Sequence, residues 1–191
     1  DISTSHGSVD YWVVRLNELG EIEWEKALGG TDVEQLQNVE ATADGGCIVS
    51  GYTSSSDGDV TENYGWNDGW IVKLTNEGEV EWETSYGGEL EDLIYAVRQT
   101  TDTGYILVGA TDHDPEIFAG AEGWIVKITN LGAIEWEYTI EGNGLDRIED
   151  IFILDTDKYI MCGSTHSTDL EVPIHHGGPD FWIIKASFNS Q

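Results

Sequence analysis

Short apolar runs separated by glycine-rich and acid-rich turns recur along the whole chain. Residues 47–53 and 105–111 are almost entirely apolar or β-branched, whereas residues 21–25 alternate between charged and apolar side chains. Continuous runs are typical of strands buried on both faces, and strict alternation is typical of strands with one solvated face. Dipeptides such as Asp44-Gly45 favour tight hairpins between such strands. Because no segment shows helical periodicity, the pattern predicts short antiparallel strands throughout.

The pattern is an internal repeat. The run DYWVVRLNELG at 10–20 returns at 68–78, 122–132 and 180–190, and its tryptophans are Trp12, Trp70, Trp124 and Trp182. The run EIEWEKALGG at 21–30 returns at 79–88 and 133–142, and the run at 39–53 returns at 97–111 and 151–165. Repeats of this size point to propellers or solenoids, each unit being one small sheet that must pack on its neighbours.

Each unit predicts four antiparallel strands, in the order VEATA-type, CIVSGYT-type, WIVKL-type and Glu-Trp-Glu. The predicted fold class is all-β, a β-propeller with four-stranded blades, of which about three and a quarter are present. The single repeat region 1–191 divides into a partial blade (1–30), two blades (31–88 and 89–142) and a partial blade (143–191). Because propellers have roughly 4–8 blades, the chain is either part of a larger propeller or a unit that assembles through open sheet edges. We expect the isolated segment not to be a stable monomer.

The shared motif is Asp-x-Trp-Ile-Val-Lys-Leu, then Gly-x-Ile-x-Trp, Gly-Gly and Asp-Gly-Gly-Tyr-Ile-x-x-Gly-Tyr-Thr. It resembles the long propeller repeats of secreted and surface proteins of Bacteroidota and archaea, which are similar to kelch and WD repeats. The resemblance covers the whole chain. It implies an extracellular or cell-surface location, and it carries over no catalytic residue.

Charge narrows the choice of partner. The chain has 191 residues and a formal net charge of −29, with only eight Lys plus Arg. Such a surface repels phosphate backbones and anionic lipids, so nucleic acid and membrane surfaces are poor partners. No apolar run is long enough to insert into a membrane. Because the chain has neither an initiator Met nor a signal peptide, we interpret it as a processed or excised segment.

The two cysteines, Cys47 and Cys162, occupy unmatched repeat positions. Small buried thiols are therefore expected in preference to a disulfide.

The Glu-Trp-Glu strands invite a catalytic hypothesis, because glycosidases use paired carboxylates. A catalytic pair is needed once, however, and this pair recurs in each blade on the outermost strand. We therefore expect solvated edge charges, no catalytic residues and no enzyme. The tryptophans between them are expected to pack between blades. The carboxylates are Glu23, Glu25, Glu81, Glu83, Glu135 and Glu137, and the tryptophans are Trp24, Trp82 and Trp136.

Two acidic loops suggest a calcium site. Asp57 and Asp59 align with Asp169 and Glu171, and alternating carboxylates around a glycine are hard ligands suited to Ca²⁺. An ordinary Asp-Gly turn is the alternative. The five histidines are interpreted as exposed loop residues, because no third ligand at a suitable spacing suggests a transition-metal site. They are His6, His113, His166, His175 and His176.

The remaining candidates for ligand contact are Tyr64 and Trp66, aromatic residues in a polar loop. We expect a non-enzymatic extracellular or cell-surface propeller module that mediates protein association, adhesion or assembly. Its partners would be proteins or other copies meeting at open edges. The alternative is a lectin-like, carbohydrate-binding propeller that uses loop aromatics and carboxylates, with glycans as ligands.

Overall fold

A computed structural model describes residues 5–112, 120–169 and 177–188. These residues form 13 β-strands in four antiparallel sheets. The first sheet pairs β1 (Tyr11–Leu16) with β2 (Ile22–Leu28). The second is β3 (Glu34–Ala41), β4 (Cys47–Thr53), β5 (Asp68–Leu74) and β6 (Val80–Tyr86), and the third is β7 (Asp92–Gln99), β8 (Tyr105–Thr111), β9 (Glu122–Ile128) and β10 (Ile134–Ile140). The last is β11 (Asp146–Asp155), β12 (Lys158–Thr165) and β13 (Asp180–Ser187).

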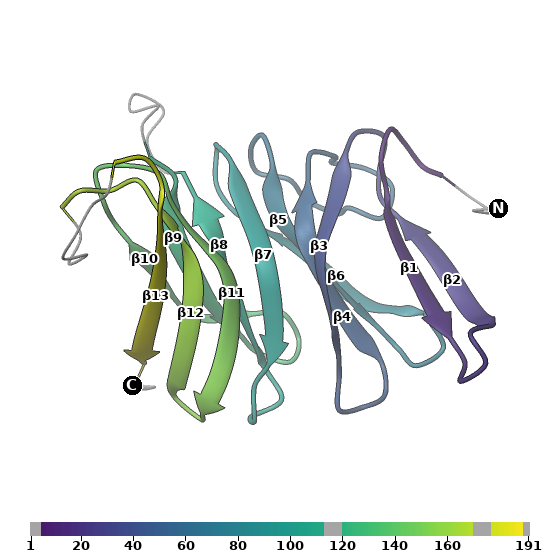
Figure 1. Ribbon diagram of the computed structural model, residues 1–191. Helices are drawn as coiled ribbons and strands as arrows, with labels where there is room; N and C mark the ends of the chain where they lie inside the picture. The colour runs from purple at the N-terminus through teal and green to yellow at the C-terminus, as the bar shows by residue number, and fades with distance from the viewer. Residues whose placement is uncertain (1–4, 113–119, 170–176, 189–191) are drawn as a thin grey trace.

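The strand grouping predicted from the repeat is confirmed. Within each sheet the strands pair in the order of the sequence, so two complete four-stranded sheets lie between two partial ones. The sheets follow one another in a row, with β1–β2 at one end and β11–β13 at the other (Figure 1). Their first strands adjoin, because β3 contacts β7 and β7 contacts β11. Among the described residues the row does not close on itself.

Apolar side chains fill the boundaries between sheets. Every residue of β5 and β8 is buried, as expected for strands covered on both faces. At the first boundary, Tyr11 and Val13 of β1 cluster with Trp70 and Val72 of β5. The next boundary joins Ile71 of the second sheet to the third sheet, and the last joins the third sheet to β11–β13. Burial of this apolar surface is the main force that holds the row together.

A glycine in the second strand of each later sheet faces a bulge in the first strand. Gly51, Gly109 and Gly163 pair with Leu36, Ile94 and Ile148, where the register shifts by one residue. A Cβ atom on Gly109 would lie 1.8 Å from the carbonyl oxygen of Leu93. The recurring Gly-Tyr-Thr-type motif therefore reflects a backbone approach that excludes any side chain.

Both cysteines are free thiols of intermediate exposure. The preference for thiols over a disulfide is confirmed, although burial is only partial.

Candidate functional site

The WIVKL-type strands, third in the predicted unit, are β1, β5, β9 and β13, and they are called third strands below. The first glutamate of each Glu-Trp-Glu strand forms an ion pair with a cationic side chain of the neighbouring third strand. Lys73 Nζ lies 2.7 Å from Glu81 and 2.9 Å from Asp44, and its side chain is only 3% exposed. The same arrangement recurs at Lys127, with Glu135 and Asp102. In the first sheet Arg15 takes the place of lysine, 2.8 Å from Glu23. A nearly buried ammonium needs such partners, because an unpaired charge there would be costly.

The second glutamate accepts a hydrogen bond from the tryptophan that leads the third strand. Trp70 Nε1 donates to Glu83 over 2.7 Å. The equivalent bonds are longer, 3.3 Å from Trp12 to Glu25 and 3.4 Å from Trp124 to Glu137. The expectation of solvated edge charges holds in part, since Glu23, Glu81, Glu135 and Glu137 are exposed. The antiparallel register between third and fourth strands sets each carboxylate beside a cross-strand donor, so both have structural partners.

The tryptophan between the two glutamates contacts the following sheet, which confirms the packing interpretation. Trp24 Nε1 donates to the carbonyl of Asn76 over 3.0 Å, and Trp82 Nε1 donates to that of Asn130 over 3.1 Å. At the last boundary the ring of Trp136 packs against Phe188, with 4.9 Å between ring centroids. Ile22, the other apolar residue of the alternating run 21–25, is 58% exposed and does not share this packing. Trp24 and Trp82 thus each bind the hairpin between the third and fourth strands of the following sheet.

The loop aspartates bind backbone amides of the preceding sheet's last loop. Asp57 Oδ1 accepts from the N–H of Thr31 over 2.8 Å, and Asp59 Oδ2 accepts from Gly29 over 3.1 Å. Asp169 repeats the first contact, accepting from Asn143 over 3.0 Å. Glu171 lies outside the described residues. These aspartates therefore clamp one sheet's loop to its neighbour's.

The clamp and a calcium site predict different effects of Asp57→Ala. We expect the variant to lower the free energy of unfolding by about 1 kcal/mol, because two acceptors for Thr31 are lost. The loss should be the same in millimolar Ca²⁺ and in chelator, as measured by thermal melting. A wild-type melting temperature that rises with Ca²⁺, and a rise that Asp57→Ala abolishes, would instead establish the calcium site.

The loop aromatics Tyr64 and Trp66 are 52% and 66% exposed. Their backbone is held in place, since the N–H of Tyr64 donates to Asp68 and that of Trp66 donates to the carbonyl of Leu90 over 3.2 Å. The Tyr64 hydroxyl donates to Glu62. Both rings thus lie on the surface of a loop that is anchored to the third sheet.

Buried carboxyl pairs at the sheet boundaries are a feature that sequence reasoning missed. Asp68, at the start of β5, and Asp92, at the start of β7, are both almost fully buried. A Cβ on Gly87 would lie 2.6 Å from Asp68 Oδ1 and 2.7 Å from Asp92 Oδ2, so both oxygens converge on this glycine. Asp10 and Glu34 converge on Gly29 in the same way. An acid at these two positions of each unit was the signal in the sequence.

The carboxylates of Asp68 and Asp92 differ in their hydrogen-bond partners. Asp92 accepts from the N–H of Gly88 over 2.7 Å and from the Thr111 hydroxyl. Asp68 accepts from Tyr64 through Oδ2, whereas its Oδ1 has no hydrogen-bond partner. The pKa of the Asp68 carboxyl is raised to about 6, chiefly by burial; the hydrogen bond from the Tyr64 N–H lowers it, and the charge of Asp92 raises it. Asp68 therefore takes up a proton in mildly acidic solution.

An open groove of about 850 Å³ lies at the last sheet boundary. Its lining combines aromatic side chains, among them Trp136, Tyr138 and Phe188, with the carboxylates Glu135 and Glu137. Aromatic rings beside hydrogen-bonding acids are suited to a polar ligand with apolar faces, such as a sugar.

Clusters of metal ligands and membrane-spanning helices are both absent from the described residues. Within residues 5–112, 120–169 and 177–188, no group of three or more His, Cys, Asp or Glu side chains is arranged to hold a metal ion. His6 and His166 are exposed, as expected, and the other three histidines lie outside those ranges. Over the same part of the chain, no helix is long and apolar enough to span a bilayer.

The chain matches no protein-family model, and no curated protein is significantly similar to it.

Proposed function

We propose that the chain is a non-enzymatic, extracellular or cell-surface β-propeller repeat module that mediates protein association, adhesion or assembly. Four features support the proposal: sheets in series, first strands that adjoin, a repeat that resembles propellers of secreted proteins, and a strongly acidic surface. The carboxylates that suggested catalysis serve as partners of Arg15, Lys73, Lys127 and the third-strand tryptophans.

The observation that carries the proposal is the exposure of apolar side chains on the two end sheets. Trp12 is 52% exposed, whereas Trp70 and Trp124, at the same repeat position, are 0% and 4% exposed. At the other end, Ile183 is 68% exposed, whereas its equivalent Ile125 is fully buried. Large apolar surfaces of this kind mark sites of protein association.

Sedimentation velocity on the wild-type chain tests this function. We expect concentration-dependent association between about 1 and 100 µM, the range of an ordinary protein contact. A folded species that remains monomeric throughout would contradict self-association as the purpose of these surfaces.

A lectin-like function is the second candidate, favoured by Tyr64, Trp66 and the aromatic groove beside Trp136. A glycan array decides whether it holds, and Trp66→Ala and Trp136→Ala then assign the site. Loss of a glycan signal in only one variant would locate the sugar. An array with no signal would remove this candidate and leave the association module unaffected.

A further inference from the structure

Every boundary between sheets joins two kinds of face. On each third strand, the residues on the same side as the leading tryptophan form what we call the tryptophan face, and the alternate residues form the opposite face. The following sheet contributes the tryptophan face of its third strand, as Trp70, Val72 and Leu74 do at the first boundary. The preceding sheet contributes the opposite face of its own third strand, as Tyr11 and Val13 do there. At the last boundary, Trp182 supplies the tryptophan face and Ile125 the opposite face. The same pair of surfaces therefore makes all three boundaries.

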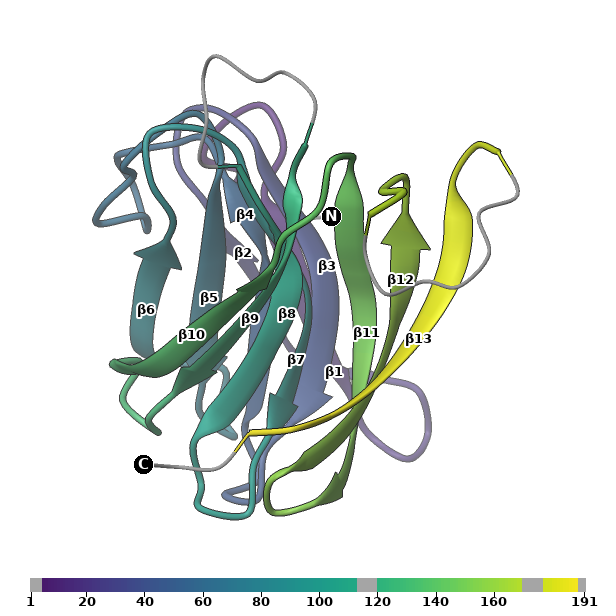
Figure 2. The ribbon, with the colours of Figure 1, turned by 90° about the vertical axis from the view of Figure 1, so that its left-hand side faces the viewer.

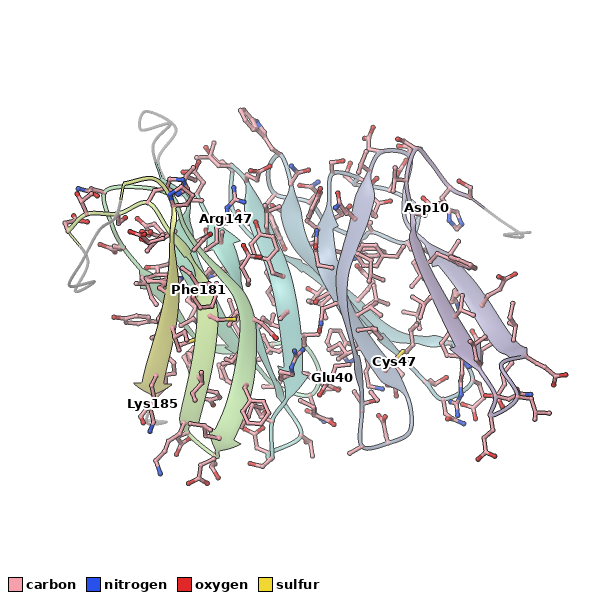
Figure 3. The ribbon with its side chains drawn as sticks, in the orientation of Figure 1. Asp10, Glu40, Cys47, Arg147, Phe181 and Lys185 are labelled. Atoms are coloured by element: carbon pink, nitrogen blue, oxygen red, sulfur yellow. The ribbon has the colours of Figure 1, made fainter. Side chains whose placement is uncertain are left out.

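One face of each kind is left uncovered, and the two lie at opposite ends of the row. On β1 the tryptophan face carries Trp12 and Leu16, which are 52% and 55% exposed. On β13 the opposite face carries Phe181 and Ile183, which are 73% and 68% exposed. Figure 2 shows β13 at the edge of the last sheet, beyond β11 and β12, and Figure 3 places Phe181 at the far end of the row from Asp10.

We propose that the uncovered face of β13 binds the tryptophan face of β1 in a second copy of this chain, so that copies associate head to tail. This inference rests on the proposed association function and names its partner and surfaces. A second copy is the favoured occupant because it carries the complement of each end face, in the combination that already packs at the three internal boundaries. Such a contact joins two different surfaces, so it continues into a ring or a filament.

Charge sets the conditions under which the contact forms. Each copy carries a formal charge of −29, so two copies repel each other at low ionic strength. Apolar contact between the end faces is insensitive to this screening. Association should therefore strengthen as salt is added, and tests belong in about 0.5 M NaCl, where the Debye length is only ~4 Å.

Two variants separate the faces without changing net charge. The first, Trp12→Thr with Leu16→Thr, removes the β1 face and keeps the β13 face. The second, Phe181→Thr with Ile183→Thr, does the reverse. A matched control, Leu131→Thr with Ile134→Thr, removes two exposed apolar side chains from the β9–β10 hairpin of an inner sheet, where they are 76% and 50% exposed. Circular dichroism and melting confirm that each variant folds, since all six positions are exposed.

We expect each face variant alone to be monomeric at ~100 µM in sedimentation velocity, whereas the control associates as the wild type does. An equimolar mixture of the two face variants should form a complex of twice the monomer mass and nothing larger, because only one productive contact remains. A face variant that still associates alone, or a mixture that remains monomeric, overturns the head-to-tail arrangement. A wild type that never associates overturns self-association altogether, and the head-to-tail contact with it. A failure of the face variants or of their mixture, in a wild type that does associate, overturns the head-to-tail contact alone, so the two failures are distinguishable.

Discussion

Gly109→Ala is expected to reduce the free energy of unfolding by at least about 3 kcal/mol, the scale of severe core disruption. The added Cβ would lie 1.8 Å from the carbonyl oxygen of Leu93 and 3.0 Å from the Cα of Ile94. Both are backbone atoms of the bulged first strand, so no rotation of a side chain relieves the contact. Urea unfolding followed by tryptophan fluorescence measures the loss.

Gly88→Ala is the matched control, because its Cβ would meet only Asp92 Oδ2, at 4.0 Å. We expect a change within about 0.5 kcal/mol for this variant, as is usual where a side chain has room. If Gly109→Ala were as stable as Gly88→Ala, the bulge opposite Gly109 would not have the geometry described above.

Asp68→Asn is expected to stabilise the fold at neutral pH by about 2–3 kcal/mol, since each pKa unit corresponds to about 1.4 kcal/mol. The pKa of Asp68 is raised from 3.8 to about 6 in the folded chain, so the folded state binds the proton more tightly than the unfolded state does. The penalty of the buried charge is therefore absent below pH 4, grows as the pH rises from 4 to 6, and is complete above pH 6. Asparagine carries no charge at any pH and retains an acceptor for the Tyr64 N–H.

Chemical unfolding of wild type and variant between pH 4 and pH 8 measures this difference, which should vanish near pH 4. Asp92→Asn is the contrasting variant, because the Asp92 carboxylate accepts from both Gly88 and Thr111. That variant should be less stable than the wild type at pH 7, since an amide has one acceptor oxygen in place of two. An Asp68→Asn variant that is destabilised at pH 7 would show that the buried charge contributes favourably.

Much of the fold was predictable because the repeat makes each unit a check on the others. The glycine turns and the change from continuous to alternating apolar runs mark the strands, and the recurrence of Trp12 at Trp70, Trp124 and Trp182 groups them into sheets. The partners of individual side chains were not predictable in the same way. The pairing of Lys73 with Asp44 and Glu81 joins the turns and strands of one sheet and depends on strand register.

The carboxyl pairs show why the candidate site was harder to predict than the fold. Asp68 and Asp92 belong to strands of different sheets, and only the packing of one sheet against the next brings their oxygens to Gly87. Asp68 aligns with Asp180 in the repeat, so its recurrence was visible. A recurring acid read along the chain suggests a loop or a metal ligand, whereas its burial follows from a boundary that the sequence does not display.

Hydrogen exchange as a function of protein concentration tests the central claim most directly, namely that the end sheets carry uncovered faces of the kind that pack within the row. We expect the amides of β1 and β13 to exchange more slowly at ~100 µM than at ~1 µM, while those of β5 and β8, already covered on both faces, are unchanged. Exchange in β1 and β13 that is independent of concentration, or protection that appears only in the loop at 61–67, would contradict the account.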